Sequence, residues 1–486
     1  MNTIFILIAI VWVFRIITNI LSWTALWWIK EYRFDRMLIH LKTKQGKKIL
    51  FPQFRLPPKS VRSVSIILVS LALLSGVYMM LGVSLLSVLI LDLLSFPLTA
   101  VVVFLSHIPI LIYHSWRIYE ATTLMRSRPD LLVIGITGSY GKTSTKEYLS
   151  TIVSQHLATL KTEASKNSPI AIAEIILKKL KPEHKIFVVE MGAYKVGEIR
   201  AMCRIVQPQI GIILAINPQH QDLFGTIETT MRAKYELVEG LSGKNIAIIN
   251  YDDLRVRTLS EWALRDGHRV LYVTKEKKEE HSKDTYEITN IESTKSRLRF
   301  SVSFDTDTKD VSVSVIGSHQ ATNITAAIVA AVTAGMPFEN AVAATKRLTS
   351  VPHVLEEKGG IAESIFIDDT FNNNPDAAKA AIAVLSKYKK RKILVFQPMI
   401  ELGTYAQSSH YDVGRSAGEV CSEVILVGED WAEDFIKGVR SVGTECVVQV
   451  LSVDKAAAYL RTHVKSSDTV LFKGKASGIV LSRIFS

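Results

Sequence analysis

The stretch from residue 136 to residue 147 reads ITGSYGKTSTKE, and it decides the fold of the chain around it. The apolar run LLVI at 131–134 precedes it, and the helical pattern YLSTIV at 148–153 follows it. This order predicts a strand, a glycine loop and the start of a helix. Gly138 and Gly141 let successive backbone N–H groups point at one anion, and the helix beginning near Lys142 adds the positive end of its dipole. The stretch is therefore predicted to bind phosphate.

The same loop carries side chains for a nucleotide and its metal. We expect Lys142 to reach the terminal phosphates and the hydroxyl of Thr143 to ligate Mg²⁺. The strict pattern GxxxxGK[ST] has glycine at position 136, where this chain has Ile136, so the loop is a relative of that pattern and not a copy. The alternative is a glycine-rich turn with a solvated lysine, but the flanking strand and helix favour the phosphate site.

Positive charge is concentrated in one segment of the chain. The 486 residues carry a net charge of +12, and the sequence pI is about 9.3. Segment 30–62 contains ten basic residues and only two acidic ones, Glu31 and Asp35. The basic residues are Lys30, Arg33, Arg36, Lys42, Lys44, Lys47, Lys48, Arg55, Lys59 and Arg62. A surplus of this kind needs a partner of opposite charge.

Apolar runs on both sides of that segment predict about three transmembrane helices within residues 1–116. They lie at 2–28, 64–82 and 85–113, and a bilayer needs about 20 such residues. A signal peptide would be shorter and would carry its positive charge in front of the apolar run. Arg15, Asp92 and His107 fall inside these runs, so they are either functional or paired structural groups.

The charge pattern also predicts how the chain crosses the membrane. By the positive-inside rule the loop 30–62 stays in the cytoplasm, and two further crossings return the chain there near Trp116. We therefore expect a multi-pass protein of the cytoplasmic (inner) membrane, with its catalytic domains in the cytoplasm. Anionic lipid headgroups are the better partner for the loop, and nucleic acid is the weaker alternative. Cys203, Cys421 and Cys446 show no ligand spacing and fit a reduced compartment.

Two α/β domains are expected after the membrane region, at 117–350 and 351–486. In each, apolar strand-like runs alternate with helical stretches, which is typical of a parallel sheet. Polar residues follow three strands of the first domain: Glu190, then the run NPQH at 217–220, then the run NYDD at 250–253. Open α/β sheets bind ligands at the carboxyl ends of their strands, so Glu190 is placed to share the Mg²⁺ of Thr143.

Several motifs together resemble the Mur ligase family, most closely its D-alanyl-D-alanine-adding (MurF-like) branch. They occur in the family's order from about residue 130 to the end of the chain: TGSYGKTS at 137–144, EMGA at 190–193, NPQH at 217–220, AKYE at 233–236, HQATN at 319–323, DDTFNNNP at 368–375, ELG at 401–403 and KG at 473–474. The resemblance implies a central P-loop ATPase α/β domain and a C-terminal Rossmann-like α/β domain.

The resemblance also implies an activity. Mur ligases are ATP-dependent amide ligases of cell-wall precursor synthesis that use ATP and Mg²⁺. A substrate carboxylate attacks the γ-phosphate to give an acyl phosphate, and an amine then displaces phosphate. The expected partners are a UDP- or lipid-linked muramyl-peptide and D-Ala-D-Ala or a similar amine. Positioned cations and metal would neutralise the charge at each step.

Site residues carried over from the family fall into four groups. Catalysis is assigned to Lys142, His220 and Lys234. ATP binding is assigned to Gly138, Ser139, Tyr140, Gly141, Lys142, Thr143, Ser144, Asn323 for adenine and Asp369 for ribose. Metal binding is assigned to Thr143, Glu190, His220 and Lys234, a lysine that the family carbamylates. Substrate binding is assigned to Asn167, Asn372, Asn374, Glu401 and Lys473. The plain alternatives are a core histidine at His220 and a surface lysine at Lys234.

The chain departs from the family pattern in four places. Val354 stands where the family usually has an arginine that helps to bind nucleotide, and Gln320 replaces an asparagine. Residues 397–399 read QPM instead of GDM, and membrane spans replace the domain that binds the UDP-sugar. Two alternatives therefore stay open: an enzyme that ligates or amidates a lipid-linked muramyl-peptide, and a catalytically weak membrane scaffold.

Overall fold

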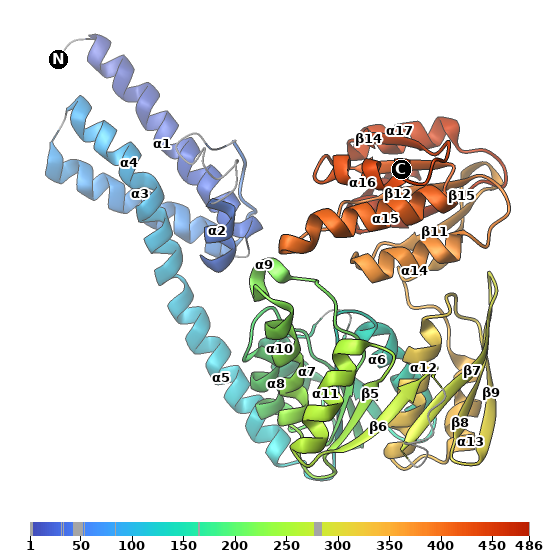
Figure 1. The fold of residues 1–486 in the computed structure, drawn as a ribbon. Coiled ribbons are helices and arrows are strands. Elements are labelled where there is room, and N and C mark those ends of the chain that lie inside the picture. The colour runs from blue at the N-terminus through green and yellow to red at the C-terminus, as the bar shows by residue number, and fades with distance from the viewer. Residues whose placement is uncertain are drawn as a thin grey trace. The chain divides into compact units, whose positions relative to one another are not determined.

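A computed structural model of the chain describes residues 3–30, 32, 34–41, 52, 54–82, 84–163, 166–276 and 284–485. It divides into two compact units, Met1–Arg117 and Ile118–Ser486 (Figure 1). Much of the basic segment 30–62, including Lys42, Lys44, Lys47 and Lys48, lies outside the described residues.

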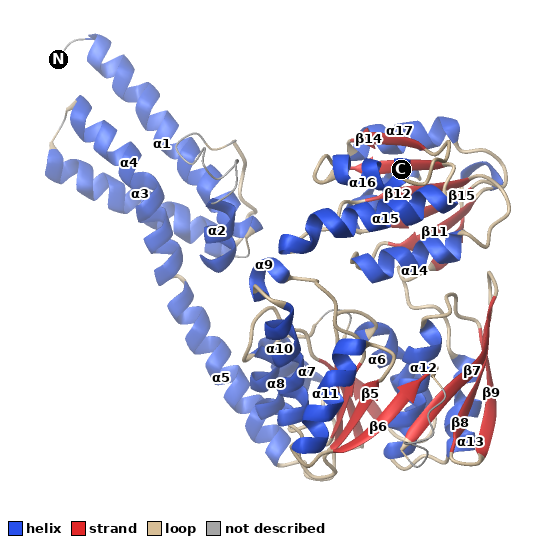
Figure 2. Cartoon of the chain, viewed as in Figure 1, coloured by secondary structure: helices blue, strands red, loops and turns tan. Residues whose placement is uncertain are grey.

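The first unit is helical (Figure 2). It contains α1 (Thr3–Ile29), α2 (Phe34–Leu41), α3 (Val61–Leu81), α4 (Leu85–Leu105) and the start of α5 (His107–Arg126). Three helical segments, Leu7–Ile29, Val61–Leu81 and Leu85–Arg126, are long and apolar enough to cross a membrane. The third was expected as a single run at 85–113, but α4 ends at Leu105. Pro109 has no N–H with which to continue the hydrogen-bond ladder of α4.

Polar groups inside this unit pair with one another. Arg15 Nε donates to Asp92 Oδ2 at 2.9 Å, and Asn19 Nδ2 donates to Asp92 Oδ1 at 3.1 Å, which joins α1 to α4. At the break between α4 and α5, Arg62 Nη2 donates to Ser106 Oγ at 3.1 Å and lies 3.0 Å from His107 Nδ1. The outward side chains of the helices are largely apolar and exposed, for example Val11, Phe14, Leu68, Leu86 and Val101.

A nine-stranded sheet forms the first half of the second unit. Its order is β2-β3-β1-β4-β5-β6-β7-β8-β9. In this order, each strand from β2 through β7 is parallel to the next. The pairs β7–β8 and β8–β9 are antiparallel. The strands are β1 (Leu132–Thr137), β2 (Thr159–Lys161), β3 (Ile186–Glu190), β4 (Ile210–Ile213), β5 (Ile246–Asn250), β6 (Arg269–Thr274), β7 (Thr285–Ser293), β8 (Leu298–Phe304) and β9 (Asp307–Val313). The polar, strand-rich section expected near 268–316 thus contains β6, which is parallel to its neighbours, and the antiparallel strands β7 to β9.

Helices cover both faces of the parallel part, because successive strand side chains point to opposite faces. Val188 packs with α6 (Lys142–Val153) and α12 (Gln320–Thr333), and its neighbours Phe187 and Val189 pack with α5, α7 (Pro169–Lys179) and α8 (Glu198–Val206). The first twelve residues of α12 are all buried, and most of them are apolar. The remaining helices are α9 (Gln221–Phe224), α10 (Ile227–Glu239), α11 (Leu254–Arg265) and α13 (Phe338–Ala344).

A six-stranded sheet of order β10-β11-β15-β12-β13-β14 forms the second half of this unit. The strands are β10 (Glu356–Gly359), β11 (Ile365–Asp369), β12 (Lys392–Phe396), β13 (Glu423–Val427), β14 (Val447–Leu451) and β15 (Thr469–Lys473), with only β10 antiparallel. The helices are α14 (Pro375–Leu385), α15 (Ala406–Val420), α16 (Ala432–Arg440), α17 (Val453–His463) and α18 (Lys475–Ile484). The predicted α/β fold class is confirmed.

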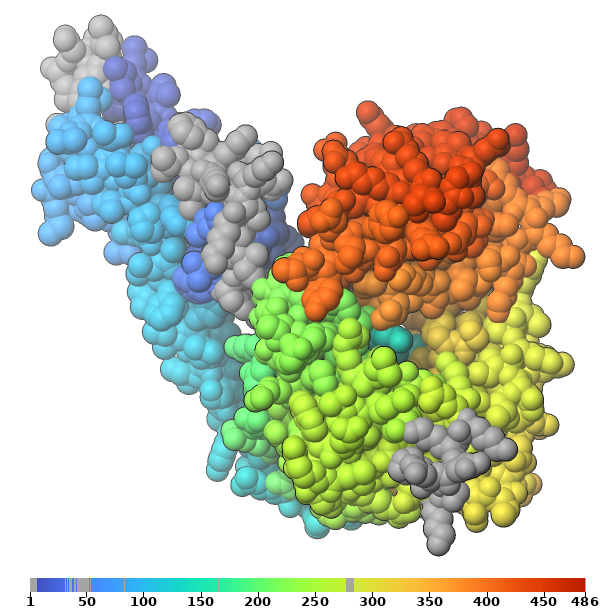
Figure 3. All heavy atoms as spheres, in the orientation of Figure 1, coloured from blue at the N-terminus to red at the C-terminus, as the bar shows by residue number. Residues whose placement is uncertain are grey.

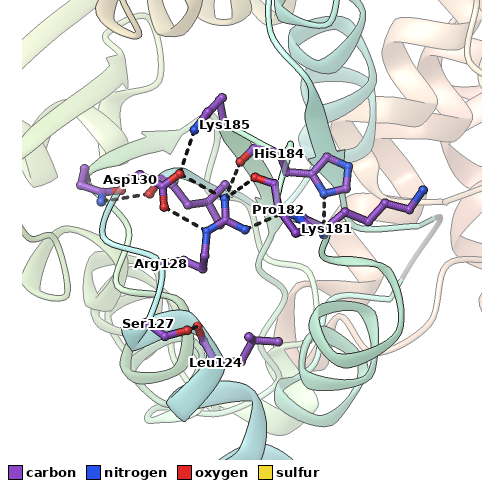
Figure 4. A network of polar contacts seen from close by, with 10 residues as sticks. Leu124, Ser127, Arg128, Asp130, Lys181, Pro182, His184 and Lys185 are labelled. Carbon is purple, nitrogen blue, oxygen red and sulfur yellow. Dashed lines mark hydrogen bonds and ion pairs between the residues drawn. The ribbon is translucent and has the colours of Figure 1, made fainter.

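A polar network holds the chain where α5 leads into β1 (Figure 4). Arg128 donates to the backbone carbonyls of Lys181, Pro182 and His184 at 3.0, 3.1 and 2.7 Å. Its Nε also donates to Asp130 Oδ1 at 2.9 Å. The five N–H groups of arginine suit this use, because one side chain satisfies several carbonyls at the end of a loop. The network fixes the position at which β1 begins, and therefore that of the loop after it.

Candidate active site

The candidate site lies where the carboxyl ends of three neighbouring strands meet. β1 pairs with both β3 and β4, and Ile136 is in register with Glu190. The glycine loop follows β1, Glu190 ends β3, and the loop 214–220 follows β4. In the space-filling view, teal atoms, in the colour of α6, are visible in a hollow of this unit (Figure 3).

Backbone geometry explains the two glycines of the loop. Gly138 has φ +153° and Gly141 has φ +81°, a region that L side chains rarely adopt. A Cβ on Gly141 would lie 2.7 Å from Asn323 Oδ1, so the loop and Asn323 approach each other as closely as glycine allows. The loop is tied to the segment after β4, since Ser139 N donates to Ala215 O at 2.7 Å and Asn217 N donates to Ser139 Oγ at 3.1 Å.

Lys142 and Thr143 are the first two residues of α6, as the sequence predicted. The ammonium of Lys142 donates to Gly138 O at 2.8 Å, so it lies over the loop itself. Burial lowers the pKa of Lys142, and the charge of Glu190 opposes that shift. A cation, a set of loop N–H groups and a helix N-terminus together form an anion site suited to the phosphates of a nucleotide.

Glu190 is the carboxylate at the centre of the site. It is 2% exposed. Thr143 Oγ1 donates to its Oε2 at 2.9 Å, Lys146 Nζ donates to the same oxygen at 3.4 Å, and Asn167 Nδ2 donates to its Oε1 at 3.0 Å. Its backbone N–H donates to Thr162 Oγ1 at 3.0 Å. Both carboxylate oxygens are therefore held by neighbouring side chains.

The donor set fits a magnesium ion. Mg²⁺ prefers hard oxygen ligands and is usually held by one or two protein carboxylates together with substrate phosphates. The hydroxyl of Thr143 and the carboxylate of Glu190 are such ligands, they are in contact, and they lie at the phosphate loop. The residues present therefore fit the metal and the nucleotide that the sequence predicted.

His220 and Lys234 lie within electrostatic reach of Lys142. Burial lowers the pKa of His220, and the charges of Lys234 and Lys142 lower it further, against the effect of Glu401. Burial together with the charge of Lys142 lowers the pKa of Lys234 to about 7. Lys234 is 4% exposed, so the surface-lysine alternative is wrong. The ring of Tyr194 packs edge-on against His220 with 4.7 Å between centroids.

Side chains of the six-stranded domain contact the loop after β4. Asn217 Nδ2 donates to Asn374 Oδ1 at 2.9 Å, and Gln219 Nε2 donates to Asn372 Oδ1 at 3.2 Å. His220 Nδ1 is in hydrogen-bond contact with Glu401 Oε2. Asn374 also caps α14 by accepting a hydrogen bond from its first turn, while its buried Nδ2 has no partner among the described residues.

Asp369 and Lys473 form a pair of their own at the ends of β11 and β15. Lys473 Nζ donates to Asp369 Oδ2 at 2.6 Å, and both side chains are nearly buried. Val354, at the position of the family's arginine, packs against the core of the nine-stranded domain. His353 beside it has its Nδ1 2.8 Å from Asp368 Oδ2, which Lys358 also contacts at 2.8 Å.

Two residues with clear places in the site were given no role from the sequence. Lys146 contacts Glu190, and Tyr194 contacts His220. Helical spacing offered a signal for Lys146, since it follows Lys142 by four residues and Thr143 by three and so lies on their face of α6. Tyr194 is in a loop, where periodicity gives no such signal.

Known proteins are similar to this chain in sequence. The sequence profile described as the Mur ligase middle domain matches residues 136–331, and that of the Mur ligase glutamate ligase domain matches residues 354–476. The chain is 28% identical over 363 residues to the UDP-N-acetylmuramoyl-tripeptide–D-alanyl-D-alanine ligase of Escherichia coli K12, which covers 74% of this chain and 77% of that enzyme. The enzyme of the same name from Synechocystis is 28% identical over 375 residues, covering 74% and 76%.

Solved structures agree with this match. MurF from Acinetobacter baumannii superposes with a TM-score of 0.68 and 27% identity, over 77% of this chain and 81% of that one. The MurF ligase of Thermotoga maritima, solved in complex with ADP, gives a TM-score of 0.67 and 25% identity, over 76% and 82%.

Proposed function

Because this chain belongs to the Mur ligase family, we propose that it is an ATP-dependent amide ligase of peptidoglycan synthesis that adds D-alanyl-D-alanine to a muramyl-tripeptide. One observation carries the proposal. The Thr143–Glu190 contact lies at the end of a phosphate loop, beside Lys142, in a chain with the two MurF-like domains.

In the first step, an oxygen of the substrate carboxylate forms a bond to the γ-phosphorus of ATP. The bond from that phosphorus to the β–γ bridging oxygen breaks, and ADP leaves with the electron pair. The loop N–H groups and Lys142 hold the phosphates and neutralise the charge that develops on them. Bound Mg²⁺, held by Thr143 and Glu190, would add charge neutralisation and orientation.

In the second step, the amine nitrogen of the dipeptide attacks the acyl carbon, and the carbon–oxygen bond to phosphate breaks. Phosphate leaves with one oxygen of the original carboxylate, and the proton that the amine loses is taken up by the released phosphate. We assign His220 and a carbamylated Lys234 to the second metal position, where the anionic carbamate would orient the metal. The pKa of about 7 for Lys234 supports this, because carbamylation needs a neutral amine.

The remaining assignments follow the positions of the side chains. Asn323, against Gly141, would bind adenine, and Asp369 would bind ribose. Asn372, Asn374, Glu401 and Lys473 come from the domain that would bring the amine, and Asn167 would act at the substrate side of Glu190.

The test uses the full chain purified in detergent with Mg-ATP, UDP-linked muramyl-tripeptide and D-Ala-D-Ala. We expect ADP, phosphate and a product heavier by the dipeptide less one water, measured by mass spectrometry. Lys142→Ala should abolish all three, while Lys178→Ala, which removes an exposed amine on α7, should not. If the chain binds Mg-ATP but forms no product with any acceptor and amine, it is a scaffold instead.

A second candidate is a ligase that acts on a lipid-linked muramyl-peptide. Three helices with exposed apolar side chains at the N-terminus favour it, because a membrane anchor would bring the site to such a substrate. We propose a multi-pass location with the ligase domains in the cytoplasm and the basic segment 30–62 near anionic headgroups. Comparing soluble and lipid-linked acceptors on protein in nanodiscs decides between the two substrates. Release of the chain from membranes by an alkaline wash would argue against the anchor.

A further inference from the structure

Lys146 is a buried cation at the active site, and the proposed mechanism gives it no role. It lies on α6 and is 0% exposed. Taking an ammonium group out of water is unfavourable unless a charged partner compensates for it. Its Nζ lies 3.4 Å from Glu190 Oε2 and 3.4 Å from Glu147 Oε1, so it bridges two carboxylates.

The two carboxylates differ in their need for Lys146. Glu147 is partly exposed and also pairs with Lys161, whose own side chain is largely in solvent. Glu190 is buried, and its other two side-chain contacts, with Thr143 and Asn167, come from neutral groups. Among the described residues, Lys146 is the cationic side chain that contacts Glu190 directly. Lys142 acts on Glu190 through its charge without contacting it, whereas Glu147 has a second ion-pair partner in Lys161. Glu190 therefore depends on Lys146 for its direct ion pair more than Glu147 does.

We propose that Lys146 is a positioning residue that holds the Glu190 carboxylate in place for the metal. It rests on the proposed function, which assigns Glu190 and Thr143 to Mg²⁺. Lys146 and Thr143 hold Oε2 from one face of α6, and Asn167 holds Oε1 from the loop before α7, so the carboxylate cannot rotate freely. Groups that orient a metal ligand in this way typically change metal affinity 10–100-fold when they are removed.

The experiment measures Mn²⁺ binding to the full chain with ADP and no acceptor, by electron paramagnetic resonance of free Mn²⁺. Lys146→Met keeps the length of the side chain without its charge, and we expect Mn²⁺ to bind at least tenfold more weakly. Lys146→Arg should recover part of the affinity. Lys161→Met, the matched control on the solvent side of Glu147, should bind Mn²⁺ within twofold of the wild type. ADP binding in EDTA should be the same in all four proteins.

Each outcome decides something different. Failure of the wild-type chain to bind Mn²⁺ with ADP would count against the proposed function. Wild-type affinity in folded Lys146→Met would overturn only the assignment of Lys146. If Lys146→Met does not fold, Lys146→Met with Glu147→Gln removes both charges of that pair, and the same loss of Mn²⁺ affinity is expected. If neither variant folds, Lys146 serves stability rather than the metal ligand, and the proposal fails.

Discussion

His220 and Glu401 are in hydrogen-bond contact although 181 residues separate them, and both have a left-handed backbone, with φ +62° and +63°. Such a conformation costs about 1 kcal/mol or more for each residue that is not glycine. Strain of this kind persists where the surrounding structure imposes it, and that happens most often at functional sites.

The contact gives Glu401 a definite effect on His220. Because burial lowers the pKa of His220, its ring is neutral at pH 7, and the nitrogen that donates to Glu401 leaves the other nitrogen free for a metal. We expect Glu401→Ala to raise the Mg²⁺ concentration needed for half-maximal ATP turnover about tenfold. Glu401→Gln, which keeps an oxygen acceptor, should have a smaller effect. Glu419→Ala, on the exposed side of α15, is the control. If all variants need the same Mg²⁺ concentration, Glu401 does not orient His220 for the metal.

Gly141→Ala should damage nucleotide binding. The new Cβ would meet Asn323 at 2.7 Å, and φ +81° is strained for alanine. We expect a loss of about 1–2 kcal/mol in stability and a clear fall in ADP affinity, measured by calorimetry. Gly197→Ala has a similarly positive φ of +96° but open space around its Cβ, so it serves as the matched control. If both variants bind ADP equally well, the close approach of Asn323 has no part in binding.

Lys234 should react with carbon dioxide in a pH-dependent way. Its pKa of about 7 means that the neutral amine becomes the main form as the pH rises through 7. With ¹³C-bicarbonate we expect a carbamate signal by NMR that is weak at pH 6 and strong at pH 8. Lys234→Arg should show none. A carbamate signal that persists in the arginine variant would mean that another lysine carries it.

Because of His319, the free energy of unfolding should fall in mild acid. Burial, together with the charge of Lys473, lowers its pKa to about 4, against 6.5 for a free histidine. The folded chain therefore binds fewer protons than the unfolded chain between pH 6.5 and 4, so stability falls as pH falls through that window. The loss at pH 5.5 is roughly 1 kcal/mol. The melting temperature of His319→Gln should fall less than that of the wild type between pH 7.5 and 5.5. An equal fall in melting temperature for the two proteins would contradict this prediction.

Sequence patterns predicted the parts of this fold that are local or fully buried. The loop 138–144, the start of α6 at Lys142 and the central strands all belong to this class. The edge strand β14 was not predicted: Gln449 interrupts its apolar residues, and all five residues are half-buried or exposed. β2 and β10 are short edge strands with the same difficulty.

Contacts between residues far apart in the sequence also differed in how well the sequence predicted them. The Thr143–Glu190 contact was predictable, because strand ends of a parallel sheet meet at one edge. The His220–Glu401 contact depends on how the two sheet domains meet, which no local pattern encodes. The ion pair of Arg15 with Asp92 shows a third case, in which the sequence marks both charges as costly but cannot show that they are partners.

The most direct test of the proposed ligase follows an oxygen atom. The acceptor, with ¹⁸O in its reacting carboxyl group, is incubated with the chain, Mg-ATP and D-Ala-D-Ala, and the released phosphate is analysed by mass spectrometry. We expect one ¹⁸O atom in each phosphate, because the carboxylate oxygen stays on phosphorus when the amine displaces it, and no phosphate from Lys142→Ala. Phosphate that carries no ¹⁸O from the acceptor would contradict the activation of a carboxylate at this loop.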